Sequence, residues 1–167
     1  MMQRDEQQSD APERTGLEAL SARGLTIPLD AAARARWQRE FNAIPAAEYM
    51  GCVLDLSHER VVRVHLPEIR PHHQGGLGTE AVNGAVLAGL CDCGLGVAGL
   101  LHFEGRRAGT VELAMKFLRP TVGATVTAYA VALKKSANMV FTEIEIYSAN
   151  RLCAIATGVV ATTSPAQ

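Results

Sequence analysis

Residues 81–101 read AVNGAVLAGLCDCGLGVAGLL, an apolar run in which Asp92 is the only charged residue. As an α-helix this run would be roughly 30 Å long, which is enough by length alone to span a membrane. An aspartate at its centre would cost about 2.5–3.5 kcal/mol in a bilayer, and the five glycines of the run weaken a membrane helix further. We therefore predict a helix that is buried in a globular core.

The chain before this run is predicted to supply two strands. From residue 49 to residue 66 apolar and polar residues alternate, as at Val62 and Val64, which is typical of a half-buried antiparallel strand. A hairpin turn is expected around residues 57–60. Residues 67–80 contain three glycines and two prolines, so this segment is predicted to be a loop that leads into the helix.

The chain after the run is predicted to supply four strands. One face of the first strand is predicted to carry Val111, Leu113, Met115 and Phe117, with Thr110, Glu112 and Lys116 on the other. The other three strands are expected near residues 123–134, 139–147 and 152–162, with a hairpin turn at residues 148–151. An antiparallel sheet that covers a helix apolar on nearly every side must curl around it, which predicts an α+β fold.

The chain before residue 45 is predicted to be helical in two places. Residues 1–30 are interpreted as a polar extension, partly disordered or short-helical, ahead of a single domain over residues 31–167, and a short helix within them should end near Gly24. A second helix, capped by Asp30 and ended by Pro45, should dock on the main body through one apolar stripe: Trp37, Phe41 and Ile44.

Composition narrows the class of protein. A chain of 167 residues with 48% hydrophobic residues suits one domain. Sixteen basic and seventeen acidic residues give a net charge of -1 without a concentrated basic stretch, which argues against a nucleic-acid partner. The first ten residues lack the apolar run of a secretory signal, so a cytoplasmic protein is expected. Four cysteines without Cys-x-x-Cys spacing predict buried free thiols rather than a zinc site or disulfides: Cys52, Cys91, Cys93 and Cys153.

The faces of the long helix predict a chemical site at Asp92. Residues without large side chains lie within about 60° of Asp92, so this face is expected to leave room: Ala85, Ala88, Gly89, Gly96 and Gly99. Because a carboxylate is seldom buried without a partner, Asp92 should face a second chain, a ligand channel or both. The alternative is a purely structural role, in which Asp92 fixes how the helix packs.

The start of the helix predicts an anion or carbonyl site. Asn83 is the expected N-cap, with the backbone N–H groups of Gly84 and Ala85 left free. Asp92 follows Asn83 by nine residues, or about 13 Å along one straight helix. This separation is too large for one bound carbonyl. A site that uses both features would therefore combine two chains.

Four segments of the chain resemble a known family: Asn83-Gly84-Ala85, Leu90-Cys91-Asp92, Thr110-Val111-Glu112-Leu113 and Phe117-Leu118-Arg119-Pro120. They are similar to the hotdog-fold acyl-CoA thioesterases of the phenylacetic acid degradation (PaaI-like) type, over about residues 43–163. Those enzymes typically read His-Gly-Gly, six residues and Asp. The spacing to Asp92 matches, whereas Asn83 and Ala85 replace the histidine and the second glycine.

The resemblance implies a hotdog fold and hydrolysis of an acyl-CoA thioester. It implies that Asp92 is the nucleophile or general base and that the amides of Gly84 and Ala85 polarise the carbonyl from the neighbouring subunit. Thr110 falls where related enzymes often hold the water or the carboxylate with a hydroxyl. The resemblance further implies a homodimer or homotetramer with its site at the subunit interface, and no cofactor beyond the CoA of the substrate.

The departures from the family pattern leave an alternative function open. Asn83 can cap the helix or bind the carbonyl, but it cannot transfer a proton at neutral pH. A non-catalytic acyl-CoA-binding or sensing protein is therefore the alternative to a hydrolase. A hotdog dehydratase is less compatible with the sequence, because such enzymes use a histidine and none occurs on or just before this helix.

The remaining chemical groups are predicted to have structural roles. Glu80 should complement the helix dipole, and His72 and His73 lack partners at metal-ligand spacing. Cys91 and Cys93 point about 200° apart on the helix, so they are expected to pack rather than react. Some of the basic residues at strand ends and turns are expected to meet CoA phosphates: Arg106, Arg107, Lys116, Arg119, Lys134, Lys135 and Arg151.

Overall fold

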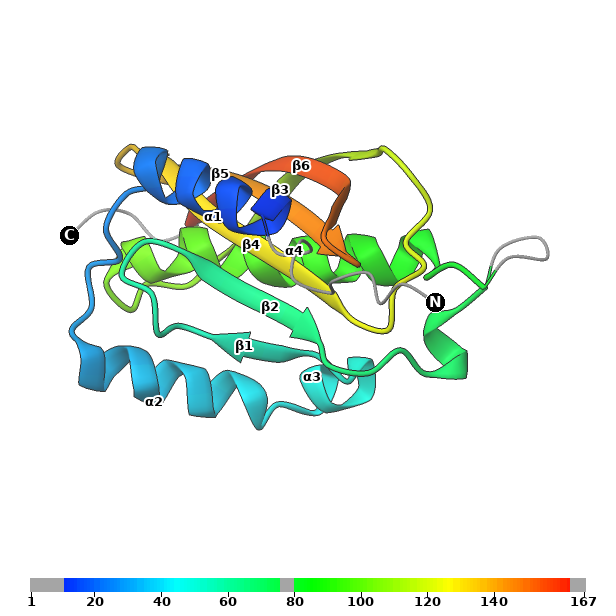
Figure 1. Ribbon diagram of the computed structural model, residues 1–167. Coiled ribbons are helices and arrows are strands. Elements are labelled where there is room, and N and C mark those ends of the chain that lie inside the picture. The colour runs from blue at the N-terminus through cyan, green and yellow to red at the C-terminus, as the bar shows by residue number, and fades with distance from the viewer. Residues whose placement is uncertain (1–10, 76–79, 163–167) are drawn as a thin grey trace.

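The computed structural model describes residues 11–75 and 80–162 (Figure 1). Its elements follow in chain order: α1 (Ala11–Arg23), α2 (Ala31–Asn42), α3 (Pro45–Met50), β1 (Val53–Asp55), β2 (Val62–Leu66), the 3-10 turn η1 (Pro71–His73), α4 (Gly84–Leu100), the 3-10 turn η2 (Leu101–Phe103), β3 (Ala108–Phe117), β4 (Val126–Lys135), β5 (Met139–Ser148) and β6 (Arg151–Thr162). The predicted order of two strands, a long helix and four strands is confirmed.

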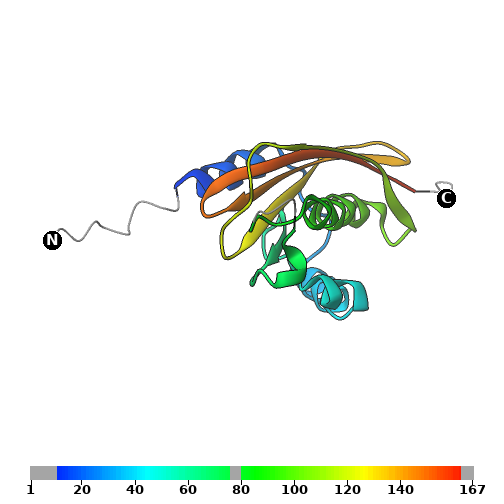
Figure 2. The ribbon, with the colours of Figure 1, turned by 90° about the vertical axis from the view of Figure 1, so that its right-hand side faces the viewer.

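The six strands form one antiparallel sheet in the order β1-β2-β4-β5-β6-β3. Figure 2 shows the sheet arching over α4, with α2 on the other side of that helix. By length and composition Gly84–Phe103 could cross a membrane. Most of its leucines instead lie in the protein core, where Leu90 and Leu95 are fully buried together with Ile144 of β5. The predicted α+β hotdog architecture around a buried helix is therefore confirmed.

Glycines of α4 let the sheet approach the helix backbone. A Cβ atom on Gly94 would lie 2.5 Å from the Ile144 side chain, and one on Gly99 would lie 2.5 Å from Val160. Side chains at these two positions would force β5 and β6 away from the helix. Gly99 was expected on a face that leaves room, and this expectation is wrong, because Val160 occupies the space beside it.

A β-bulge in β3 changes which side chains face α4. Thr110 pairs with Val160 and Glu112 pairs with Val159, so Val111 is an extra residue in the ladder. Val111 is 66% exposed, whereas Thr110 lies on the inner face opposite buried Val160. The predicted faces of this strand are therefore wrong at Thr110 and Val111. A uniform alternation cannot reveal a one-residue insertion in the ladder.

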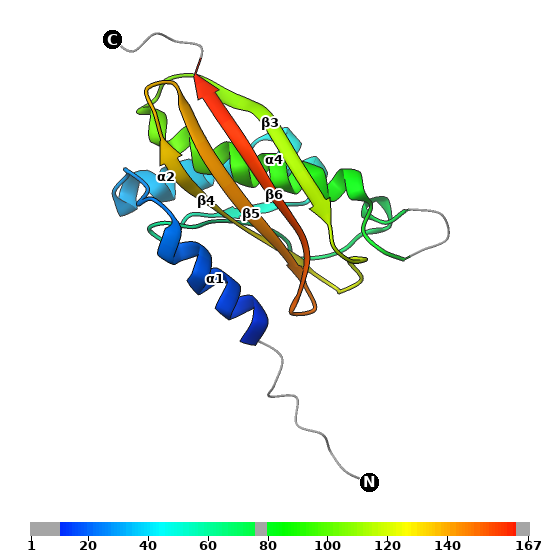
Figure 3. The same ribbon diagram turned by 90° about the horizontal axis from the view of Figure 1, so that it is seen from above.

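The helices before β1 close one edge and one face of the sheet. On the edge, the Asn42 side chain accepts from the Leu54 N–H (2.8 Å) and donates to the Leu54 carbonyl (2.9 Å), while Gln38 accepts from the Leu56 N–H (2.8 Å). On the outer face of the sheet, α1 buries Leu20 against β4 and β5 (Figure 3). The short helix predicted to end near Gly24 is present as α1.

Pro45 begins a helix as well as ending one. The helix capped by Asp30 ends at Asn42, and Pro45 then occupies the first turn of α3. The chain was predicted to be extended from residue 49 onward, and this prediction is wrong for Tyr49 and Met50, which end α3. The hairpin predicted at residues 148–151 is confirmed, and Ala149 and Asn150 have the positive φ values (46° and 57°) that such a turn requires.

His73 ties the loop before α4 to the rest of the molecule. Its ring is buried, with Nε2–H donating to the Met50 carbonyl (2.9 Å) and Nδ1 accepting from the Arg70 N–H (3.0 Å). Its backbone carbonyl accepts from the Asn83 N–H (2.8 Å). The neutral ring therefore links α3, η1 and the residue that caps α4.

Replacing Gly99 by alanine is expected to destabilise the protein. The new methyl group would overlap Val160, which should cost about 1–3 kcal/mol in the free energy of unfolding measured by chemical denaturation. Gly89→Ala is the matched control, because its Cβ would meet only the flexible end of Met50 and alanine favours the helix by about 1 kcal/mol. Equal destabilisation by both changes would contradict this account of the packing.

The stability of the protein is expected to fall below about pH 6.5, the ordinary pKa of histidine. Burial, with a smaller effect from His72, lowers the pKa of His73, so the folded state favours its neutral ring. This contribution to the free energy of unfolding is complete above the pKa that His73 has in the unfolded chain. It is lost as the pH falls through the lower pKa of the folded state. Burial also lowers the pKa values of His65 and His102. Denaturation at several pH values should show a shallower pH dependence in His73→Gln than in the wild-type protein, and an equally steep one would contradict this role of His73.

Candidate active site

Asp92 lies in an open stripe that runs along α4. The carboxylate is exposed and makes no hydrogen bond or ion pair with the described residues. Most of the other helix positions that are not buried lie within about 80° of it: Gly84, Ala85, Ala88, Gly89, Gly96 and Leu100. The partly buried Val86 and Cys93 lie about 100–120° away. Asp92, the one carboxylate of α4, is therefore accessible in a single chain to a ligand or a second chain that covers this stripe.

The start of α4 has one free amide instead of the expected two. The Asn83 side chain caps the helix as predicted, with Oδ1 accepting from the Ala85 N–H (2.8 Å). The expectation that the Ala85 amide is free is therefore wrong. The Gly84 N–H makes no hydrogen bond within the described ranges and points out of the positive end of the helix. The Asn83 Nδ2 is also engaged, because it donates to the Gly75 carbonyl (3.0 Å).

Phe117 lies directly over the helix start. A Cβ atom on Gly84 would be 3.3 Å from the Phe117 ring, so glycine at this position lets the ring approach the backbone. The two residues line a hollow of about 390 Å³, whose other walls include Leu87, Arg119 and Thr121. The Thr121 hydroxyl is buried and has no hydrogen-bond partner among the described residues. The free Gly84 amide thus opens beside an apolar hollow with a cation near it.

Thr110 lies one turn beyond Asp92 along the helix. Its Oγ1 is 3.2 Å from the position that a Cβ atom on Gly96 would take, and Gly96 follows Asp92 by four residues. The β3 bulge turns Thr110 toward α4, since it places this residue opposite inward-facing Val160. The predicted pairing of a hydroxyl with the Asp92 face is therefore compatible with the structure.

The two cysteines beside Asp92 are poorly suited to nucleophilic chemistry. Burial and the Asp92 carboxylate raise the pKa of Cys91 to about 12, and its Sγ contacts the Met115 sulfur at 3.9 Å. A hydrogen bond with Cys52, together with burial, raises the pKa of Cys93 as well. Both thiols therefore stay protonated at neutral pH.

The other candidate groups lie apart from this stripe. Glu80 is exposed just before the helix, and His73 uses both ring nitrogens in the structural contacts described above. Among the described residues, no three His, Cys, Asp or Glu side chains gather as metal ligands do. Of the predicted phosphate-binding residues, Arg119 lines the hollow at the helix start, whereas Lys135 pairs with Glu104 at 3.7 Å.

Two contributors to the site were missed in the sequence. Phe117 was assigned only to a strand face, although its ring covers the helix start and remains 57% exposed. Met50 was assigned to an extended segment, although it lies in α3 with its sulfur end against Gly89 of the open stripe. The glycines at residues 84 and 89 are the only sign of these two contacts in the sequence. A glycine permits another residue to approach closely, but the sequence does not show which residue does so.

The comparisons with known proteins support the same fold. Residues 80–155 match the sequence pattern of the thioesterase superfamily. A thioesterase from Haemophilus influenzae has a similar structure, with 16% identity and a TM-score of 0.71 over 86% of this chain and 97% of that chain. No functionally curated protein matches the sequence significantly.

Two further solved structures resemble this chain. The Escherichia coli PaaI protein from the phenylacetic acid degradation operon has 19% identity and a TM-score of 0.67 over 87% of this chain and 97% of that chain. A protein from Thermus thermophilus has 26% identity and a TM-score of 0.60 over 71% of this chain and 97% of that chain. This chain therefore has the same fold as these proteins, the hotdog fold, and its expected resemblance to the PaaI-like thioesterases is confirmed.

Proposed function

We propose that this protein hydrolyses an acyl-CoA thioester to the free acid and CoA, with Asp92 as the catalytic carboxylate. The observation that carries the proposal is the exposed, unpaired Asp92 on the core helix of a thioesterase fold. Asp92 interrupts the apolar sequence of α4 without forming a hydrogen bond or ion pair with the described residues. A role toward a substrate accounts for it better than a role in folding.

A second copy of the chain completes the proposed site. Gly84 and Asp92 are eight residues apart, or about 12 Å along one helix, so they cannot meet the same carbonyl within one chain. In a pair of chains the carboxylate of one helix and the free Gly84 amide of the other can converge on one thioester. Two equivalent sites then arise from one twofold axis.

The sheet offers one edge for this pairing. Asn42 occupies both backbone groups of Leu54 in β1 and Gln38 the Leu56 N–H just after that strand, which blocks this edge. In contrast, β3 pairs only with β6, so its other side presents free backbone groups. Val111 and Phe117 on or beside this edge are 66% and 57% exposed. Pairing along β3 would bury both side chains and bring the two open stripes together.

The proposed chemistry needs one base and one hydrogen-bond donor. Asp92 accepts a proton from water as the water oxygen attacks the thioester carbonyl, and the Gly84 N–H stabilises the developing oxyanion. The C–S bond then breaks, and the departing thiolate takes up the proton from Asp92. Asn83 positions the helix start and transfers no proton, so Asp92 handles both proton transfers.

The same carboxylate supports a second route to the same products. Asp92 can attack the carbonyl itself, which releases the thiolate and forms an acyl-aspartate anhydride that water then hydrolyses. A single turnover in ¹⁸O-labelled water tests for the nucleophilic route. Label in the Asp92 carboxylate indicates a nucleophile, because only an anhydride that water opens at the aspartyl carbon places the water oxygen there.

The non-catalytic alternative has one observation in its favour. The site has a single free amide, because the Ala85 N–H and both side-chain groups of Asn83 are already engaged. A binding protein would show tight association with acyl-CoA and no turnover on short, aromatic or long acyl chains. Turnover of any of these thioesters would exclude it.

Asp92→Asn is expected to lower kcat by at least about 100-fold, because amide replacement removes the base. The change should leave the fold intact, since Asp92 is exposed and makes no hydrogen bond with the described residues. Steady-state assays against a panel of acyl-CoAs measure the effect, with circular dichroism to confirm folding. Glu80→Gln is the control and should retain activity, and full activity of Asp92→Asn would refute the site.

Gly84→Pro is expected to abolish most turnover, because proline lacks the N–H that stabilises the oxyanion. Proline suits the first position of a helix, and Asn83 before it already has extended backbone angles (φ -62°, ψ 139°). Gly84→Ala is the matched control, since it adds the same contact with Phe117 but keeps the N–H. Kinetic assays should place Gly84→Ala well above Gly84→Pro in kcat.

Mixing inactive Asp92→Asn and Gly84→Pro chains tests whether the site spans two subunits. Each mixed dimer would contain one site with an intact carboxylate and an intact amide, so an equilibrated equimolar mixture should regain about one quarter of wild-type activity. If both groups acted within one chain, the mixture would stay inactive. Sedimentation measurements on the same samples would establish that dimers form.

A further inference from the structure

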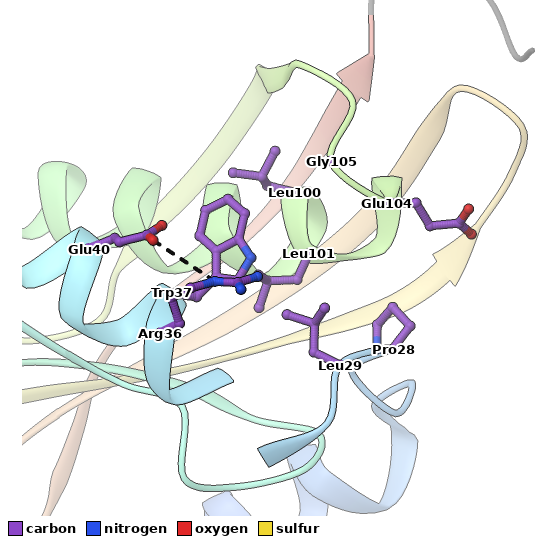
Figure 4. A pocket seen from close by; sticks show the side chains of 9 residues that line it. All are labelled: Pro28, Leu29, Arg36, Trp37, Glu40, Leu100, Leu101, Glu104 and Gly105. Atoms are coloured by element: carbon purple, nitrogen blue, oxygen red, sulfur yellow. Dashed lines mark ion pairs between the residues drawn. The ribbon is translucent and has the colours of Figure 1, made fainter. Parts of the chain in front are cut away.

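A second hollow lies at the far end of the open stripe. It has a volume of about 460 Å³ and lies between α2 and the last turn of α4. Figure 4 shows the Trp37 ring rising from α2 toward Leu100 and Leu101, with Leu29 beside them. Its walls are mainly apolar, and the charges at its rim include an Arg36–Glu40 pair at 3.9 Å. Such a hollow suits a hydrocarbon end rather than a charged group.

The hollow continues the stripe on which Asp92 lies. Gly96 and Leu100 follow Asp92 by four and eight residues, which keeps both within about 80° of it around the helix. Neither residue is fully buried. Gly96 adds no side chain to the helix surface between Asp92 and Leu100, and the Thr110 hydroxyl of β3 borders this path.

The distance between Asp92 and the hollow corresponds to a hydrocarbon chain of definite length. Eight helical residues span about 12 Å. An extended alkyl chain with carbon–carbon bonds of about 1.5 Å advances about 1.3 Å per bond, so about eight to ten carbons cover this distance. Shorter acyl groups would end before they reach Trp37.

The other end of the stripe is less suited to an acyl chain. Met50 packs against Gly89 on that side, and the proposed pairing of two chains places the partner's α4 alongside that part of the helix. Toward Leu100 the described side chains leave the hollow accessible. A chain bound at Asp92 therefore has more room toward the end of α4 than toward its start.

We propose that this hollow receives the distal end of the acyl chain and that Trp37 and Leu100 set the preferred chain length. The proposal deepens the proposed function and rests on it for the position of the thioester. It identifies the substrate as a medium-chain acyl-CoA, with about eight to ten carbons in the acyl group.

Trp37 supplies a direct test, because it is the only tryptophan in the sequence. Asp92→Asn protein is titrated with acetyl-, butyryl-, octanoyl- and decanoyl-CoA, and with free CoA, while tryptophan emission is recorded. Octanoyl- and decanoyl-CoA should shift the emission, whereas acetyl-CoA, butyryl-CoA and free CoA should leave it unchanged. An identical response to butyryl- and decanoyl-CoA, or no response to either, would overturn the proposal.

A variant with a larger side chain in the hollow provides a second test. Leu100→Phe should remove the emission shift with decanoyl-CoA and, in the otherwise wild-type enzyme, lower kcat/KM for decanoyl-CoA about tenfold relative to butyryl-CoA, a typical effect of changing an apolar pocket. Met139→Phe is the control, since Met139 is exposed on β5 and is not among the residues that line the hollow. A decanoyl shift that survives in Leu100→Phe would contradict the assignment.

The two proposals fail in different ways. Hydrolysis of acyl-CoAs with a tryptophan emission that ignores chain length would overturn the acyl-chain site and leave the hydrolase standing. A chain-length-dependent emission shift without hydrolysis of any thioester would overturn the hydrolase and leave the acyl-chain site standing.

Discussion

Close packing between the α4 backbone and the sheet is the constraint on which the rest of the structure depends. Gly94 and Gly99 let Ile144 and Val160 reach the helix at distances that a side chain would forbid. The helix is therefore held firmly on its sheet side, and only one stripe of its surface remains open. Asp92 lies in that stripe because its charge is compatible with no other position around the helix.

In the proposed enzyme, the same arrangement leaves a single chain without a complete site. One end of α4 offers a free amide at Gly84, and its middle offers the Asp92 carboxylate, but a rigid helix keeps them about 12 Å apart. The blocked β1 edge and the open β3 edge leave one obvious way for a second chain to bring them together. In the proposed enzyme, the hollow beside Trp37 then adds chain-length selection from elements outside the reacting centre.

Much of the fold and of the candidate site was predictable from the sequence, because these features depend on local periodicity. The run around Asp92 and the alternating strands were recognised from spacing alone, and the Asn83 cap from the preference of that residue for helix starts. The errors arose where residue spacing alone does not decide the outcome. The bulge at Val111 depends on the register with β6, and the loss of the Ala85 amide depends on the rotamer of Asn83.

The sequence by itself determined a buried helix with one carboxylate, a capped start and the order of the surrounding strands. These features follow from residue spacing and from the cost of burying a charge. Only the tertiary structure decided that Gly99 is packed, that Phe117 covers the helix start and that Trp37 borders a hollow in line with Asp92. Such relations join residues far apart in the chain, and the packing of one element on another sets them.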